Sequence, residues 1–170
     1  MALAGRSNSG KSSLLNCIGG RRGLARVSKT PGRTRRIHFF ADRHAGLSLV
    51  DLPGYGFSRA AKSERERFAA AVERYLRERP LLRGLVLLLD VRRAPEVEER
   101  MLVEFARSRA IGVMPVATKV DKLGRAERTR RFRELDRAGL GTWIPFSATT
   151  GEGREAVIEA VLDCAKGRAA

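Results

Sequence analysis

The chain has 170 residues, 43% of them hydrophobic, which is enough to bury one core and too little for two ordinary domains. The apolar run at 85–89 is far shorter than the ~18 residues that span a bilayer, so we expect one soluble, cytoplasmic domain over 1–170. A net charge of +15 favours a polyanionic partner such as RNA over acidic small molecules. Because most of the basic residues are arginine, codon usage in a GC-rich genome stays open as another cause.

Short β-rich apolar runs alternate with helix-period segments, which predicts an α/β fold with a mainly parallel six-stranded sheet and helices on both faces. The connection "ADRHAG" at 41–46 is too short for a crossover, so one strand pair should be an antiparallel edge hairpin. In chain order, we expect strands at 1–4, 36–41, 46–53, 84–90, 111–119 and 142–148, and helices at 11–18, 64–78, 95–109, 124–138 and 152–166.

The segment "GRSNSGKSS" follows the first strand and opens the first helix. It satisfies G-x-x-x-x-G-K-[ST], in which backbone N–H groups wrap phosphates and Lys11 reaches the outer ones. The strand–loop–helix context is the one that a phosphate cradle requires. The residues expected to bind nucleotide here are Gly5, Arg6, Ser7, Asn8, Ser9, Gly10, Lys11, Ser12 and Ser13.

A second element, "DLPG", ends the third predicted strand. It offers the Asp51 carboxylate to the surroundings of Mg²⁺ and the Gly54 backbone N–H to a γ-phosphate. Alone this pattern is weak, but its place after a strand agrees with the phosphate loop. Leu52 and Pro53 complete the expected contact segment.

The base is indicated by "TKVD", which follows a strand. A carboxylate at Asp121 accepts hydrogen bonds from N1–H and the 2-amino group of guanine, whereas adenine offers no donor at either place. In "SAT", the Ala148 backbone N–H can meet guanine O6. These residues therefore predict GTP rather than ATP; they are Thr118, Lys119, Val120, Asp121, Ser147, Ala148 and Thr149.

Together these motifs resemble the EngB (YihA/YsxC) family of translation-factor-type P-loop GTPases. The more specific matches are "GRSNSGKSSLLN", "SKTPGRTRRIHFF", "LVDLPGYGF", "GLVLLLDVRRAPEVEERML" and "ATKVDKL", and the resemblance runs nearly from end to end. It implies a P-loop GTPase fold and a monomer that assists maturation of the large ribosomal subunit, contacting rRNA and ribosomal proteins. It also implies a link to cell division and septation. Family members carry a further segment before the first strand, which we expect to be missing here.

The resemblance also assigns the metal and the switches. Ser12 and Thr34 would supply hydroxyl ligands to Mg²⁺, and Asp51 would hold a metal-bound water. Gly32, Arg33 and Thr34 would lie in the first switch, within the long irregular stretch at 19–36. Gly54 would lie in the second switch. The residues expected to assist hydrolysis are Asn8, Lys11, Thr34 and Gly54.

Tyr55 stands where a water-orienting glutamine could be expected, and a phenol cannot orient water as an amide does, so intrinsic hydrolysis should be slow. Asn8 is expected to help hold K⁺ beside the phosphates, with a plain loop residue as the alternative. Arg33 is expected to be a surface charge, with an arginine finger in cis as the alternative.

Two sets of arginines bear on an RNA partner. Arg33, Arg35 and Arg36 flank Thr34, which would couple RNA binding to the nucleotide. The set at 130, 133 and 137 lies among acidic residues, and we expect a largely self-paired, solvated face there. Two other functions stay open: a division-site GTPase that acts through protein partners, and an RNA-binding module with a structural nucleotide.

Overall fold

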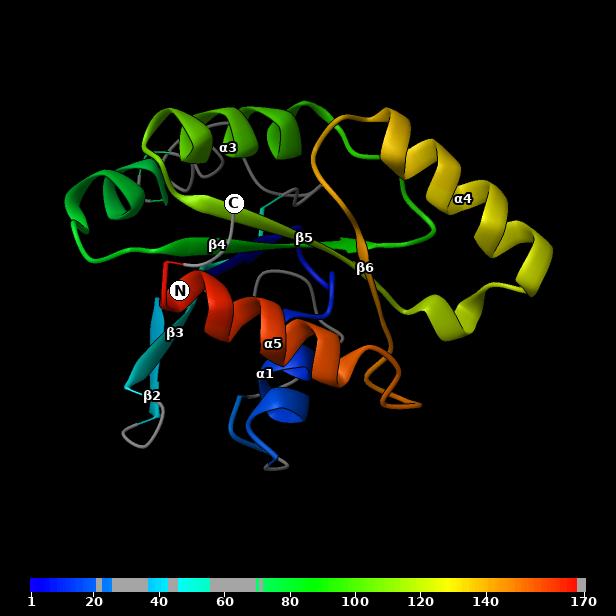
Figure 1. Ribbon diagram of the computed structural model, residues 1–170, viewed down its shortest axis with the longest axis horizontal. Coiled ribbons are helices and arrows are strands. Elements are labelled where there is room, and N and C mark those ends of the chain that lie inside the picture. Colours follow the sequence, from blue (N-terminus) through cyan, green and yellow to red (C-terminus); the bar gives the residue numbers. More distant parts are fainter. Residues whose placement is uncertain (21–22, 26–36, 43–45, 56–69, 71, 168–170) are drawn as a thin grey trace.

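The computed structural model describes residues 1–20, 23–25, 37–42, 46–55, 70 and 72–167. Six strands form one sheet in the order β2-β3-β1-β4-β5-β6 (Figure 1). Only the β2–β3 pair is antiparallel, and the other paired strands are parallel. The predicted fold is therefore confirmed. The strands are β1 (Ala2–Gly5), β2 (His38–Asp42), β3 (Leu47–Asp51), β4 (Gly84–Asp90), β5 (Gly112–Thr118) and β6 (Ile144–Phe146).

Helices cover both faces of the sheet (Figure 1). On one face lie α1 (Lys11–Ile18) and α5 (Arg154–Ala165); on the other lie α3 (Val97–Ser108), α4 (Arg125–Arg137) and a helical stretch at 72–78. The part of the predicted helix at 64–69 falls outside the described residues. A 3₁₀ turn at Val120–Lys122 was not predicted.

The central strand β4 explains the continuous apolar run. All seven of its residues are buried, with Val86 and Leu88 packed on the side of α1 and α5. Leu87 and Leu89 pack on the opposite side with α3. Because the strand is covered on both faces, its sequence shows no alternation of polar and apolar residues. Among the described residues, no helix is both long and apolar enough to cross a membrane.

Cys17 and Cys164 are both free thiols. Cys164 lies on the inner side of α5, 4% exposed, with its Sγ 3.4 Å from the Arg83 carbonyl oxygen just before β4. Cys17 is only partly buried. Burial raises the pKa of the Cys164 thiol, and the nearby chain amino group opposes that rise.

The parallel strands deliver the sequence motifs to one edge of the sheet. The phosphate loop follows β1, "DLPG" begins at the end of β3, "TKVD" begins at the end of β5, and "SAT" follows β6. Ligands of open α/β sheets bind at this carboxyl edge. The topology therefore assembles four segments that lie far apart in the sequence.

Candidate functional site

The phosphate loop is shaped by close backbone approaches. A Cβ atom added to Gly5 would lie 2.4 Å from the Leu88 carbonyl oxygen, so only glycine lets the loop leave β1 beside β4. A Cβ atom on Gly54 would lie 2.9 Å from Lys11 Nζ and from Ser7 N. The second motif is thus packed directly against the first, as a shared phosphate site requires.

Lys11 is buried inside this loop. Its Nζ donates to the carbonyl oxygens of Gly5 at 2.9 Å and Arg6 at 3.2 Å. Burial lowers the pKa of Lys11 to about 8, with the charge of Asp51 opposing that decrease. A cation that is poorly hydrated in this way is well suited to pair with a phosphate.

Asp51 is 3% exposed at the end of β3. Burial raises the pKa of Asp51, while the charges of Lys11 and His38 lower it. Its Oδ1 atom is buried and has no hydrogen-bond partner among the described residues, and the same is true of Ser9 Oγ. A buried carboxylate oxygen without a partner is costly unless a cation or a water completes it.

Tyr55 is held between the phosphate loop and α3. Its carbonyl oxygen accepts from Ser7 N at 2.8 Å, and its side chain lies beside Glu99, which is fully buried. Burial and the charge of Glu99 raise the pKa of Tyr55 well above its usual value. Beside it, Arg6 pairs with Glu96 at 2.7 Å. The phenol thus lies against the side of α3 that carries Glu99.

The guanine side is a connected hydrogen-bond network. Lys119 Nζ donates to the Asn8 carbonyl oxygen at 2.8 Å and to Asp90 Oδ2 at 2.9 Å. Thr118 Oγ1 donates to the Ser9 carbonyl oxygen at 2.7 Å. The two predicted segments, "TKVD" and the phosphate loop, are therefore tied together through side chains of the first and backbone carbonyls of the second.

Asp121 is oriented by "SAT". Ser147 Oγ donates to Asp121 Oδ1 at 2.7 Å, and this bond is the main reason that the pKa of Asp121 is lowered. Ser147 is fully buried and also accepts from the backbone N–H groups of Thr149 and Thr150. The carboxylate predicted to recognise guanine is therefore held charged and in place.

Sequence reasoning missed Asp90, Arg92 and Glu99. Arg92 makes a bidentate pair with Asp90, at 2.9 Å to Oδ1 and 2.6 Å to Oδ2. Burial raises the pKa of Asp90, but hydrogen bonds from Arg92 and Lys119 outweigh it and hold the pKa well below its usual range. Asp90 ends a buried strand at the carboxyl edge, the same signal that identified Asp51. The E-x-x-E spacing of Glu96 and Glu99 is the corresponding signal for a helix capping box.

The structure thus brings 5–13, 51–54, 118–121 and 147–149 to one sheet edge. Gly32, Arg33 and Thr34, together with Arg35 and Arg36, lie outside the described residues, so their predicted roles remain predictions. No group of three or more His, Cys, Asp or Glu suited to a metal occurs in the part of the chain that is described. Hydroxyl ligands and phosphate oxygens, which the predicted Mg²⁺ site uses, do not depend on such a group.

The arginines of α4 are only partly self-paired. Glu134 binds Arg131 at 2.6 Å and lies 3.9 Å from Arg130. For Arg133 and Arg137 no ion pair occurs among the described residues. Among the described residues, the predicted self-pairing therefore holds for Arg130 and not for Arg133 or Arg137.

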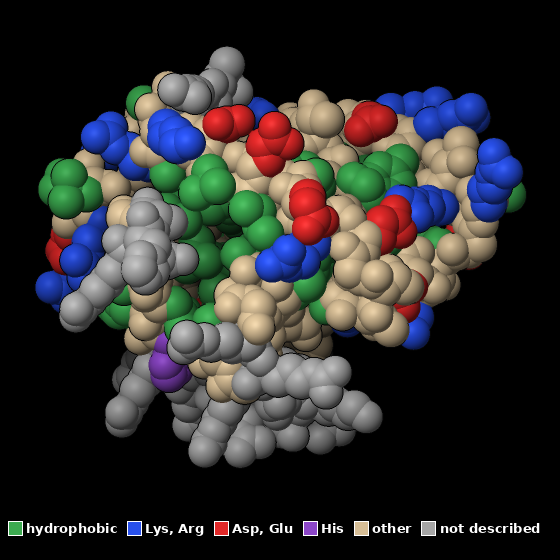
Figure 2. Space-filling model, turned by 60° about the horizontal axis from the view of Figure 1, so that its bottom comes forward, with side chains coloured by type: hydrophobic (Ala, Val, Ile, Leu, Met, Phe, Trp, Pro, Cys, Tyr) green, Lys and Arg blue, Asp and Glu red, His purple; other side chains and the backbone are tan. Residues whose placement is uncertain are grey.

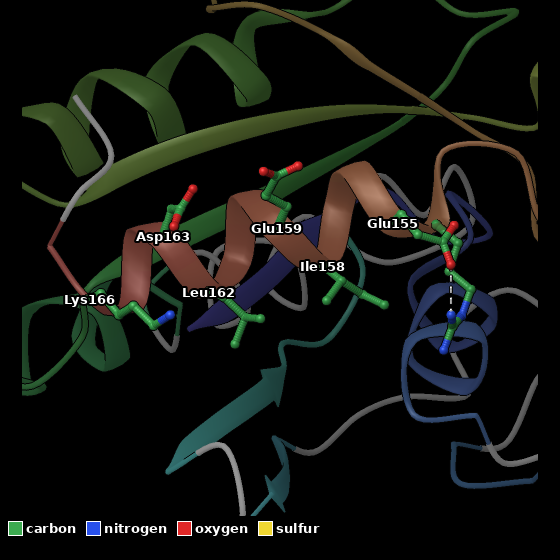
Figure 3. Close-up of a pocket in the computed structure, with 7 residues that line it drawn as sticks. Glu155, Ile158, Glu159, Leu162, Asp163 and Lys166 are labelled. Carbon is green, nitrogen blue, oxygen red and sulfur yellow. Dashed lines mark hydrogen bonds and ion pairs between the residues drawn. The ribbon is translucent and has the colours of Figure 1, made fainter.

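A shallow pocket runs along α5, away from these motifs (Figure 3). Ile158 and Leu162 point to one side of the helix, and the carboxylates of Glu159 and Asp163 point to the other. None of the nucleotide-motif residues lines it. It offers no set of converging polar groups and carries no functional assignment.

Comparison with known proteins agrees with this site. Residues 1–119 match the model of a family described as 50S ribosome-binding GTPase. A probable GTP-binding protein EngB from Oleidesulfovibrio alaskensis is 48% identical over 157 residues, covering 91% of this chain and 72% of that protein. The corresponding protein of Exiguobacterium sibiricum is 41% identical, covering 95% of this chain and 85% of its own length.

Solved structures show the same fold. The crystal structure of a probable GTP-binding protein EngB superposes with a TM-score of 0.78 at 23% identity, covering 98% of each chain. Aquifex aeolicus Era bound to GDP and AlF4⁻ superposes with a TM-score of 0.75 at 21% identity, covering 95% of this chain and 55% of Era. With the nucleotide motifs gathered at one edge and relatives of this similarity, the chain belongs to the EngB family of GTP-binding proteins and is a GTPase.

Proposed function

We propose that this GTPase is a nucleotide-dependent switch that assists assembly of the large ribosomal subunit in the cytoplasm. The observation that carries the proposal is the match of residues 1–119 to a family described as 50S ribosome-binding GTPase, because that span includes the phosphate loop and the second switch motif. The net charge of +15 supports a partner rich in RNA. Loss of this function would impair the supply of ribosomes, and this would account for a link to cell division and septation.

A structural neighbour gives further support. Era, at a TM-score of 0.72 and 20% identity, has been solved in complex with MgGDPNP and nucleotides 1506–1542 of 16S ribosomal RNA. That complex concerns Era, of which the matched fold covers 55%. The RNA contact proposed for the present chain rests on its own residues.

We further propose that Ser12, Thr34 and Asp51 hold Mg²⁺. Ser12 is the second residue of α1, beside the phosphate loop, and the Asp51 carboxylate is buried with one oxygen lacking a hydrogen-bond partner in the described part of the chain. These features fit a cation at this place. When bound, Mg²⁺ would neutralise phosphate oxygens. Lys11 would then pair with the phosphates, and the Gly54 backbone N–H would donate to the γ-phosphate.

Because Tyr55 stands where a water-orienting glutamine could be expected, a monovalent cation would be another way to assist hydrolysis. Asn8 has a left-handed backbone conformation, φ 62°, in the loop that precedes Lys11. We propose that Asn8 helps to hold K⁺ beside the phosphates. GTP hydrolysis should rise when K⁺ replaces Na⁺ at equal ionic strength, and Asn8→Ala should remove that difference. Equal rates of the parent protein in both salts would exclude this role.

The switch function is tested by co-sedimentation with purified large-subunit particles in GDP, in a GTP analogue and without nucleotide. We expect tighter binding and a steeper salt dependence in the GTP analogue, because an ordered switch presents Arg33, Arg35 and Arg36 together. Replacing both Arg35 and Arg36 by alanine should weaken binding in the GTP analogue without changing nucleotide affinity. Equal losses in both nucleotide states would make these arginines general basic surface.

Two other outcomes would replace the proposal. Association with ribosomes from cells that survives nuclease, but is absent with purified subunits, would favour a division-site GTPase acting through protein partners. RNA affinity that is identical in GDP and in the GTP analogue would favour an RNA-binding module whose nucleotide is structural.

A further inference from the structure

An arginine and two aromatic rings form a cluster at the outer edge of the sheet. Phe39 lies on the edge strand β2 and is 55% exposed, whereas Tyr75, from the helical stretch at 72–78, is 9% exposed. Their ring centroids are 6.3 Å apart at an interplanar angle of 60°. The Arg79 guanidinium lies 5.3 Å from the centroid of Phe39 and 5.4 Å from that of Tyr75. We call Phe39, Tyr75 and Arg79 the edge cluster.

The geometry separates a supporting ring from a presented one. Tyr75 packs into the core under the sheet face and fixes the position of the cluster. Phe39 keeps more than half of its surface in water, although it is a large apolar side chain next to an arginine. An exposed ring held beside a fixed guanidinium is a ready surface for a flat, electron-rich partner.

The charge around the edge cluster favours an anion. The acidic residues of the neighbouring helical stretch are already paired, Glu78 with Arg74 at 3.0 Å and Glu73 with Arg77. By contrast, Arg79, Arg83 and Arg109 are exposed and make no ion pair within the described residues. Arg109 instead donates to the Arg77 carbonyl oxygen at 3.2 Å. Among the described residues, the unpaired charge next to the exposed ring is therefore that of Arg79.

Lys and Arg side chains gather at both ends of the face in Figure 2, with Asp and Glu between them. The edge cluster combines an exposed aromatic ring with an arginine. Among the described residues of α4, the cation–π contact is between Arg128 and Phe132.

We propose that the edge cluster binds an unpaired nucleotide of RNA, with the base stacked on Phe39 and a phosphate held by Arg79. Arginine suits this role because its face can rest on the rings while its N–H groups stay available to phosphate oxygens. Single-stranded nucleic acids are bound by such stacking platforms beside basic grooves. The inference deepens the proposed ribosomal function by naming unpaired bases as the feature contacted.

The test uses the full chain bound to GDP and a fluorescein-labelled single-stranded oligoribonucleotide of adenine and uracil, with a duplex of the same sequence for comparison. Phe39→Ala should weaken binding to the single strand by about 5-fold to 100-fold, the range found when a stacking aromatic is removed. Duplex binding should change by less than about 2-fold, because paired bases are not available for stacking. Phe39→Tyr should bind as the parent does, since it keeps the aromatic face.

Two controls separate stacking from apolar contact and from general charge. Phe39→Leu keeps an apolar side chain but no aromatic face, so it should lose as much affinity as Phe39→Ala. Arg79→Ala should reduce the slope of log K against log salt by about 0.7, the value for one phosphate contact on a single strand. The charge-matched change Arg133→Ala, on the exposed face of α4, should alter that slope by less.

Phe39→Ala should leave the slope unchanged. The thermal unfolding and the GDP affinity of each variant establish that the fold persists.

Several results would overturn the inference. These are parent-like binding by Phe39→Leu, equal losses for single strand and duplex, or equal effects of Arg79→Ala and Arg133→Ala. Loss of binding by the Phe39 variants to large-subunit particles but not to the oligoribonucleotide would assign the edge cluster to a protein partner instead. If the parent protein sediments with particles and the Phe39 variants bind both particles and RNA normally, only this inference fails. If the parent protein binds particles in no nucleotide state, but the Phe39→Ala and Phe39→Leu variants lose single-strand binding as expected, only the ribosomal function fails.

Discussion

The two halves of the nucleotide site differ in how their polar atoms are satisfied. On the guanine side, Lys119, Asp90, Asp121 and Ser147 bond to one another or to backbone carbonyls. On the phosphate side, Ser9 Oγ and Asp51 Oδ1 are buried with no hydrogen-bond partner among the described residues. Among the described residues, the acceptors of Lys11 there are carbonyl oxygens of its own loop.

This contrast indicates that the guanine side and the phosphate side of the site have different roles. A network that is complete within the protein is preorganised, so base selection costs little reorganisation. A set of buried groups that lacks partners gains most when phosphate and cation arrive. Base identity should therefore depend on rigid side chains, whereas nucleotide state should depend on groups that change their partners.

The largest expected effect comes from breaking the guanine side at Asp121. Asp121→Asn removes the acceptor pair for guanine N1–H and the 2-amino group, so GTP affinity should fall about 100-fold or more. Xanthine nucleotide should gain affinity, which titration of both nucleotides by fluorescence or calorimetry measures. Ser147→Ala, which removes the orienting bond of 2.7 Å, is the graded control and should cost less. Unchanged GTP affinity in Asp121→Asn would contradict the assignment of this carboxylate.

The next effect tests whether the network behaves as one unit. Asp90→Asn weakens the hold on Lys119, which also bonds to Asn8 in the phosphate loop. Nucleotide affinity should fall about 10-fold, the value of one charge-assisted hydrogen bond. Arg92→Ala removes the more exposed partner of Asp90 and should cost only a fraction of that. If Arg92→Ala costs as much as Asp90→Asn, then Asp90 acts through Arg92 and not through Lys119.

The phosphate side should be detectable as proton uptake when nucleotide binds. Free Lys11, with a pKa of about 8, is largely neutral at pH 8.5, whereas bound phosphates favour its charged form. GDP binding should then take up most of one proton at pH 8.5, and affinity should fall about threefold between pH 7.5 and 8.5. Calorimetry in two buffers of different ionisation enthalpy measures the uptake. Binding without proton uptake at pH 8.5 would show that Lys11 is already charged in the free protein.

The smallest kinetic effect is expected at Tyr55. Because its side chain lies beside Glu99 of α3, Tyr55→Phe should change intrinsic GTP hydrolysis by less than about 2-fold. The same change removes the hydroxyl group that lies beside the buried Glu99, which should cost about 1–3 kcal/mol in the free energy of unfolding. Chemical denaturation and single-turnover hydrolysis measure the two quantities. A large loss of hydrolysis with unchanged stability would give the phenol a catalytic role.

Much of this arrangement could be predicted from sequence, because the motifs carry their physical requirements in fixed spacing. The fold followed from the buried run of β4 and from the alternation of strand and helix patterns separated by turn signals. Lys11 and Asp121 were predicted because each belongs to a motif of fixed spacing that follows a strand. The confirmed fold is therefore the part that local pattern determines, and the roles of these two residues remain predictions.

The remaining features depend on contacts between segments that are distant in sequence. Nothing near Tyr55 indicates Glu99, which lies 44 residues later on α3 and meets the ring only after the sheet has formed. The edge cluster likewise joins β2 to residues beyond the segment 56–69. The pairing of Asp90 with Lys119 required the register of β4 against β5, in which Asp90 is paired with Thr118.

The unequal burial of the two thiols makes them internal reporters of unfolding. Cys17, on the partly exposed side of α1, should react with a thiol reagent after small local motions of that helix. Cys164 has a raised thiol pKa and lies beneath the start of β4, so its modification should await opening of the sheet itself. The interval between the two labelling steps would then measure how long local opening at α1 precedes unfolding of the sheet in the nucleotide-bound domain.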